Sequence, residues 1–119
     1  MAYEEEGDIL EVVFDGVEAN CAVELTDNIV LRFHRQEGRA AGLTLLDFSV
    51  LVSSTELGMR SFALSGLDSL PADLRKMVVR LITTGPVNLF LKVTTFYTSS
   101  SQQVPLTYVE SPREFALAA

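Results

Sequence analysis

Apolar and polar residues alternate along the first half of the chain with the two-residue period of β-strands. The alternation runs through residues 8–15, 21–25, 29–34 and 41–46. Residues with turn-forming side chains or tolerance of positive φ separate these runs, namely Asp15-Gly16, Thr26-Asp27-Asn28 and Gln36-Glu37-Gly38. Since short connections usually join antiparallel neighbours, the pattern predicts a meander of four antiparallel strands within residues 8–47. An apolar, β-branched run at residues 50–52 favours continuation of the last strand.

The strongest helical pattern lies at about residues 69–84. Its apolar residues recur at three- and four-residue spacing, at Leu70, Leu74, Met77, Val78 and Leu81. Ser69 is predicted to cap the first turn, and Gly85 is predicted to end the helix in a left-handed conformation before Pro86. Val79 and Ile82 lie away from the main apolar stripe. We therefore expect the helix to be covered on a second side, with Val79 and Ile82 as candidate residues of a partner interface.

The remaining pattern predicts a C-terminal hairpin. Residues 87–97 are rich in β-branched and aromatic side chains, residues 98–103 are polar, and residues 104–109 indicate a returning strand in which Pro105 favours an edge or an end. A short strand is indicated at residues 61–64 and a helical turn at residues 112–117.

These elements predict one domain of residues 1–119 with an α+β fold. We expect a mainly antiparallel sheet, made of the N-terminal four-strand meander and the C-terminal hairpin, packed on the principal helix at about residues 69–84. The meander would lie within residues 3–50, and the helix and hairpin would extend it over residues 51–119.

Composition bears on association. The chain has 119 residues, 48% of them hydrophobic, and a mean hydropathy of +0.27. A domain this small has much surface for its volume, so spare apolar residues favour a homodimer or a protein partner. The net charge of −7 disfavours nucleic-acid binding. The charge is uneven: residues 1–59 carry twelve acidic and three basic side chains, or −9, and residues 60–119 carry four and six, or +2.

Three features of the sequence favour the cytoplasm. Cys21 is the single cysteine, so no intrachain disulfide can form. The acidic N-terminal segment lacks the basic and apolar regions of a signal peptide. No apolar run reaches the roughly 18 to 20 residues that cross a bilayer. We therefore expect a soluble cytoplasmic protein without a membrane span.

Several kinds of chemistry lack the residues that they need. His34 is the single histidine, and with Cys21 it cannot supply the four ligands of a structural zinc site. Cys21 alternates in phase with Val23 and Leu25, as a small core residue does. The sequence also lacks the glycine-rich nucleotide motifs and the Gly-x-Ser-x-Gly element of hydrolases. We expect no metal, no cofactor and no catalytic cluster.

Charged residues on the predicted sheet give the candidate ligand site. Glu11 and Glu24 would share one face, and Arg32 and His34 would share a face of the strand before the turn at residues 36–38. Paired carboxylates support acid–base chemistry in a pocket, but an ordinary solvated face has the same pattern. Arginines near this turn, namely Arg32, Arg35 and Arg39, would grip an anionic ligand or remain solvated turn charges.

A further set of residues carries a family resemblance. They are Tyr3, Asp8, Leu10, Val23-Glu24, Ile29-Val30-Leu31 and Gly38-Arg39-Ala40-Ala41-Gly42-Leu43-Thr44-Leu45-Leu46-Asp47-Phe48-Ser49. In this order they resemble the YuzE-like domain of unknown function over residues 3–50, whose members look like Y-x4-D-x-L, a β-hairpin and G-R-x-x-G-[IL]-E-[IL]-L. The chain departs from the pattern because Thr44 replaces the usual glutamate and because Arg32 and His34 precede the turn. The resemblance implies no catalytic residues, and it implies an antitoxin-like role for some members.

The sequence supports three functional hypotheses. The first is a non-enzymatic protein-binding or assembly module. The second is an antitoxin-like protein that masks a basic toxin with its acidic N-terminal half. The third is a small-ligand binder or enzyme with a sheet-face or intersubunit pocket around Glu11, Glu24, Arg32 and His34.

Overall fold

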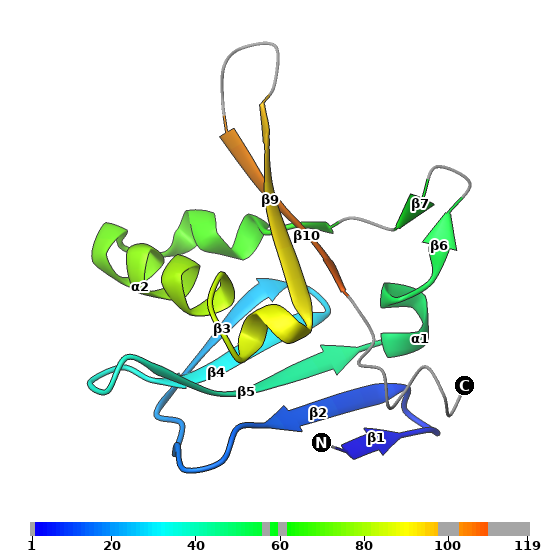
Figure 1. Cartoon of the computed structure of the whole chain (residues 1–119), viewed down its shortest axis with the longest axis horizontal. Coiled ribbons are helices and arrows are strands. Elements are labelled where there is room, and N and C mark those ends of the chain that lie inside the picture. The colour runs from blue at the N-terminus through cyan, green and yellow to red at the C-terminus, as the bar shows by residue number, and fades with distance from the viewer. Residues whose placement is uncertain (1, 56–57, 60–61, 98–102, 110–119) are drawn as a thin grey trace.

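The alternating segments form a five-stranded antiparallel sheet (Figure 1) in a computed structural model that describes residues 2–55, 58–59, 62–97 and 103–109. Its strands are β1 (Ala2–Glu4), β2 (Ile9–Val13), β3 (Cys21–Thr26), β4 (Ile29–His34) and β5 (Arg39–Leu46). The four predicted strands are all present, and the α+β class is confirmed. The short acidic strand β1 was not predicted, because three residues are too few to show a period.

The strand order is β1-β2-β5-β4-β3, which refines the predicted meander. Strands β3, β4 and β5 follow one another as consecutive hairpins, but β2 pairs with β5 instead of β3. The connection of residues 14–20 therefore crosses from one side of the hairpins to the other, an order of the Greek-key type. Alternation identifies a strand from its own side chains, but the order depends on tertiary packing that this pattern does not encode.

One face of the sheet forms the core. Its side chains are buried and come from four strands: Leu10, Val12, Val23, Leu25, Ile29, Leu31, Phe33, Leu43 and Leu45. They belong to one cluster with buried residues of the helices and of the second half of the chain, including Leu67, Val78, Ile82, Leu91 and Val109. In Figure 1, α2 and the base of β9 and β10 accordingly lie on one side of this sheet.

The chain turns sharply after β5. Asp47 adopts a left-handed conformation with φ of 52°, and helix α1 (Phe48–Leu51) follows at once. The predicted strand continuation at residues 50–52 is therefore wrong. Phe48 and Leu51 are buried on the core side of α1, and their spacing of three suits a helical turn better than alternation in a strand.

The principal helix is α2 (Ala72–Ile82), preceded by the 3-10 helix η1 (Ser65–Ser69). The predicted helix is present, but it is shorter at both ends and its predicted caps are wrong. Ser69 Oγ donates a hydrogen bond to the Gly66 carbonyl oxygen instead of capping α2. At the other end, Thr83 follows the helix and its Oγ1 donates to the Val79 carbonyl oxygen at 2.7 Å. Gly85 does not adopt positive φ.

The second half of the chain forms two small sheets. The elements are β6 (Ser54–Thr55), β7 (Gly58–Met59), β8 (Phe62–Ala63), η2 (Val87–Leu89), β9 (Leu91–Tyr97) and β10 (Gln103–Val109). The predicted C-terminal hairpin is β9–β10, although residues 87–89 form a 3-10 helix instead of a strand. β10 lies between β8 and β9, and Pro105 lies just outside the stretch paired with β8. The predicted turn at residues 112–117 lies outside the described residues.

None of the described helices combines the length and the apolar character that a membrane span requires.

Candidate interaction face

The second face of the five-stranded sheet, here called the outer face, is mostly accessible to solvent. Its residues alternate with the core residues along each strand and are Ile9, Glu11, Val13, Ala22, Glu24, Val30, Arg32, His34, Thr44 and Leu46. Val13 is the most exposed of the large apolar side chains on this face, at 57%. All four residues of the predicted ligand site lie here.

The strand register separates the two candidate carboxylates. Glu11 pairs with Thr44, Thr44 with Val30, and Val30 with Glu24, so the four residues form one row across the sheet. Glu11 and Glu24 are therefore three inter-strand spacings apart, about 14 Å. Paired carboxylates that share acid–base work lie within about 10 Å of each other. The fold thus puts Glu11 and Glu24 on one face without making them a catalytic pair.

Arg32 lies across the middle of the outer face. It occupies the row next to the carboxylates, opposite Gly42 on β5, and its Nη2 reaches over that strand to the Val12 carbonyl oxygen at 3.4 Å. A Cβ atom at Gly42 would lie 2.7 Å from Arg32 Nη2, so the glycine makes room for the guanidinium group. Among the described residues, Arg32 Nε is a buried donor without a hydrogen-bond acceptor. No carboxylate of the described residues forms an ion pair with Arg32.

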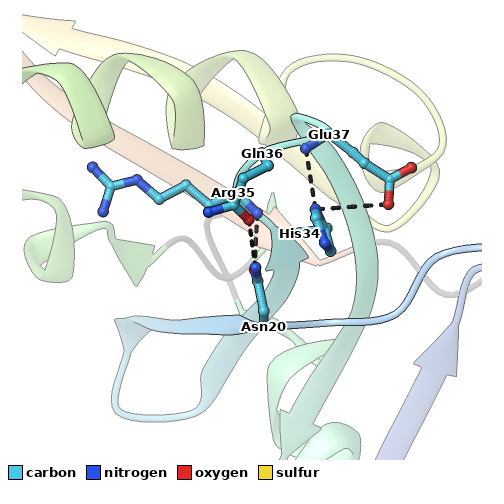
Figure 2. A network of polar contacts seen from close by, with 5 residues as sticks. All are labelled: Asn20, His34, Arg35, Gln36 and Glu37. Atoms are coloured by element: carbon cyan, nitrogen blue, oxygen red, sulfur yellow. Dashed lines mark hydrogen bonds and ion pairs between the residues drawn. The ribbon is translucent and has the colours of Figure 1, made fainter.

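His34 stabilises the β4–β5 turn, as Figure 2 shows. Its Nδ1 accepts a hydrogen bond from the Glu37 amide at 3.1 Å, so this nitrogen is unprotonated in that arrangement. The Glu37 carboxylate, 3.6 Å away, therefore forms no charge pair with a neutral ring. Asn20 holds the turn from β3's side by accepting from the Arg35 amide at 2.9 Å and donating to Gln36 Oε1 at 2.6 Å. His34 thus has a structural partner within its own turn.

Opposite charges occupy neighbouring rows of the outer face. Glu11 and Glu24 lie in one row, whereas Arg32 lies in the next row and His34 and Arg39 pair with each other beyond it. We call the Glu11–Glu24 row the acidic row, and Arg32 and Arg39 the basic end. The charge difference between the two halves of the chain did not predict this division, because the acidic row and the basic end both lie within the acidic first half.

The two candidate interface residues on α2 have different environments. Val79 is 38% exposed, whereas Ile82 is fully buried in the core cluster. Ile82 therefore does not reach the surface of the chain, and its separation from the main apolar stripe reflects the depth at which the end of α2 is buried. Of the two, Val79 remains available for contact with a partner.

A polar cluster that sequence reasoning missed joins the β1–β2 turn to the β5–α1 corner. Asp8 accepts hydrogen bonds from the Tyr3 hydroxyl at 2.6 Å and from the Ser49 amide and hydroxyl, and its φ of 54° is left-handed. Hydrogen bonds from Ser49 and then Tyr3 lower the pKa of Asp8. The hydrogen bond to Asp8 raises the pKa of Tyr3. The Y-x4-D spacing of the family pattern was the available signal, because it contains the two residues that touch.

The fold also shows where the side chains that could act as metal ligands lie. Cys21 packs against the core cluster, as its phase with Val23 and Leu25 predicted. Within residues 2–55, 58–59, 62–97 and 103–109, no three histidine, cysteine or acidic side chains gather where they could hold a metal ion.

Comparisons with protein-family models, with curated proteins and with solved structures each found no match.

Proposed function

We propose that the protein is a non-enzymatic, cytoplasmic protein-binding or assembly module whose partner is a second copy of the same chain on the outer face. The observation that carries this proposal is the pair of adjacent, oppositely charged groups on that face, the acidic row and the basic end. Arg32 forms no ion pair with either carboxylate of the acidic row. A face of this kind is complementary to itself.

Charge complementarity selects one arrangement of the two copies. A two-fold axis that lies between the sheets and runs across their strands reverses the strand direction from one copy to the other. This rotation brings the acidic row of each copy over the basic end of its neighbour. An axis parallel to the strands would instead bring like charges together, which is unfavourable.

Arg32 has a specific acceptor in this arrangement. Its guanidinium group ends above β2, near the Val12 carbonyl oxygen, and the rotation brings Glu11 of the second copy over that position. The carboxylate would then accept hydrogen bonds from the guanidinium group of Arg32. Because of the two-fold symmetry, this contact between Arg32 of one copy and Glu11 of the other forms twice. The exposed Val13 lies beside each pair and supplies apolar contact.

The size of the face indicates a weak dimer. Four inter-strand spacings of about 4.8 Å and about five residues along each strand give a projected area near 320 Å² per copy. A standard stable interface buries about 800 Å² of accessible surface per partner. We therefore expect an association that depends on concentration in the micromolar range or above.

An assembly role is also consistent with the separation of the candidate catalytic groups. Glu11 and Glu24 are about 14 Å apart, and His34 is engaged within its own turn. The resemblance of residues 3–50 to the YuzE-like domain, which we retain as a proposal, likewise implies no catalytic residues. The antitoxin alternative would require the acidic row to bind a different, basic protein.

Sedimentation velocity over a range of protein concentrations tests the proposal. Val13→Asp adds a carboxylate close to the site that Glu11 of the second copy would occupy, so we expect a monomer at concentrations where the wild type dimerises. Val50→Asp is the matched control, because Val50 is 50% exposed on α1, outside the outer face. A wild-type protein that stays monomeric at all concentrations, or equal dimerisation of both variants, would refute the proposal.

A further inference from the structure

A cavity of about 590 Å³ lies where the end of β2, the β4–β5 turn and the end of α2 meet. Its volume falls within the range of about 300 to 1,000 Å³ that is usual for small-molecule sites. The cavity was not predicted, because its walls come from three segments that are far apart in the sequence. Two of its lining residues, Val13 and Arg39, also belong to the outer face, whereas Arg80, Leu81 and Pro86 do not.

Arg80 supplies the first cation of the cavity. This side chain projects from the last turn of α2 and donates from Nη2 to the Gly38 carbonyl oxygen at 3.3 Å. Gly38 has a φ of 62°, and a Cβ atom there would lie 2.8 Å from Arg80 Nη2. The glycine therefore permits both the tight turn and the approach of the guanidinium group. Most of the five guanidinium donors stay available for a ligand.

Arg39 supplies the second cation, next to Gly38 in the chain. Neither arginine forms an ion pair with a carboxylate of the described residues, whereas Arg35 in the same turn lies 3.6 Å from Asp73. Asp15 is the carboxylate among the lining residues. The cavity thus carries a formal charge of +1 in a protein of net charge −7, which favours a ligand with a single negative charge over a dianion.

Apolar side chains form part of the remaining wall, although the exposed surface of the cavity as a whole is more polar than apolar. Phe14, Leu81 and Pro86 line it, with Thr84 as a neutral polar neighbour. The ring of Phe14 also packs against the ring of Phe90, with a centroid distance of 6.4 Å, and this contact helps to fix the position of Phe14. A ligand that fits this wall has an apolar body as well as a charged group.

The turn that carries Arg39 is held in place before any ligand arrives. The Gly38 amide donates to the His34 carbonyl oxygen at 2.9 Å, and the Glu37 amide donates to His34 Nδ1 (Figure 2). Asn20 fixes the start of the same turn. Because the fold already orders this turn, ligand binding does not carry the entropy cost of ordering it.

We propose that this cavity binds a small organic monocarboxylate, with its carboxylate on Arg39 and Arg80 and its apolar body against Phe14, Leu81 and Pro86. The planar guanidinium group matches a carboxylate with two parallel hydrogen bonds. Arg80 lies on α2, outside the outer face, so the variant Arg80→Gln tests this site separately from the proposed assembly role.

Amide NMR titrations of the full chain with phenylacetate and with hexanoate test this site. We expect saturable shifts at Arg39, Ala40 and Leu81, and about tenfold weaker binding in Arg39→Gln and in Arg80→Gln. Arg35→Gln is the matched control, because Arg35 belongs to the same turn and points to Asp73, and it should bind like the wild type. Both cavity arginines are exposed, so cooperative thermal melts near that of the wild type are expected for each variant.

Neutral phenylacetamide separates charge recognition from apolar binding. The proposal predicts that it binds at least about tenfold more weakly than phenylacetate. Equal affinity for the acid and the amide, equal affinity of both cavity variants and the wild type, or the absence of saturable shifts with both carboxylates would overturn it.

Discussion

At the scale of single residues, Asp8 organises the corner where β1, β2 and α1 meet. Its carboxylate accepts from Tyr3 and Ser49, and its own carbonyl oxygen accepts from the Phe48 amide at 2.9 Å. The ring of Tyr3 lies 5.8 Å from that of Phe48, so the polar contacts and the aromatic contact support each other. One residue thus connects the N-terminal hairpin to the helix that follows β5.

Asp8→Asn tests this connection. Asparagine tolerates the left-handed backbone but lacks the charge, so we expect a loss of about 1 kcal/mol in the free energy of unfolding at pH 7. Because the pKa of Asp8 is lowered in the folded protein, its contribution is complete above the pKa of the unfolded chain. It is lost as the pH falls through the lower folded pKa.

Denaturant unfolding at several pH values checks this prediction. The difference in stability between the wild type and Asp8→Asn should shrink as the pH is lowered from about 5 to about 2. A difference that stays constant over this interval would show that the charge of Asp8 contributes nothing to folding.

Residue patterns predicted which face each charged side chain occupies, but not how far it reaches. Alternation placed Glu11 and Arg32 correctly relative to the core, because a strand has a period of two. It gave no sign that Arg32 crosses β5, since that path depends on Gly42 being the neighbour across the sheet. The left-handed backbone of Asp8 was likewise invisible, because it follows from contacts with Tyr3 and Ser49 that only the folded chain brings together.

At the scale of elements, α2 contributes to the core mainly through its last turns. Val78, Leu81 and Ile82 are buried, whereas Leu74 near the start is only partly buried. The helical period predicted the element and its direction toward the sheet. The same period led to the prediction that Ile82 belongs to a partner interface. Periodicity tells which face of the helix a residue occupies, but not how deeply the neighbouring elements cover that face.

Alanine substitutions in α2 test this assignment. Ile82→Ala removes a fully buried side chain and should lower the free energy of unfolding by about 2 to 5 kcal/mol. Val79→Ala, three residues earlier and 38% exposed, should change it by no more than about 0.5 kcal/mol. Thermal or denaturant unfolding checks both, and comparable losses in the two variants would contradict the assignment.

The contact between η1 and the edge strand β3 depends on Gly66. A Cβ atom at this glycine would overlap the Glu24 carbonyl oxygen of β3. Gly66→Ala should therefore destabilise the fold by about 1 to 3 kcal/mol or more, because the backbone of one element has to move.

Gly85→Ala is the control for this substitution. Its Cβ atom would meet no atom closer than 3.6 Å, and Gly85 does not have a left-handed φ. We expect a change between zero and a gain of about 1 kcal/mol from the reduced freedom of the unfolded chain. Chemical unfolding of both variants measures the difference, and similar stabilities would show that η1 does not pack tightly on β3.

At the scale of the whole molecule, one face of the sheet is covered and the other is open. The helices and the second half of the chain cover the inner face, and the acidic row and the basic end divide the outer one. The sequence predicted a sheet on a helix and a tendency to associate, because these follow from period and composition. The position of the contact surface depends on strand order and register, which bring Glu11, Arg32 and Glu24 into neighbouring rows.

Exchange of the paired charges tests the proposed assembly most directly. Arg32→Glu and Glu11→Arg should each be monomeric alone in sedimentation velocity, because both contacts of the two-fold pair would then join like charges. Mixed in equal amounts, the two variants should form a heterodimer in which both contacts are restored, and added salt should weaken it. If each variant dimerises alone as the wild type does, or if the mixture stays monomeric while the wild type dimerises, the outer face is not the contact surface proposed here.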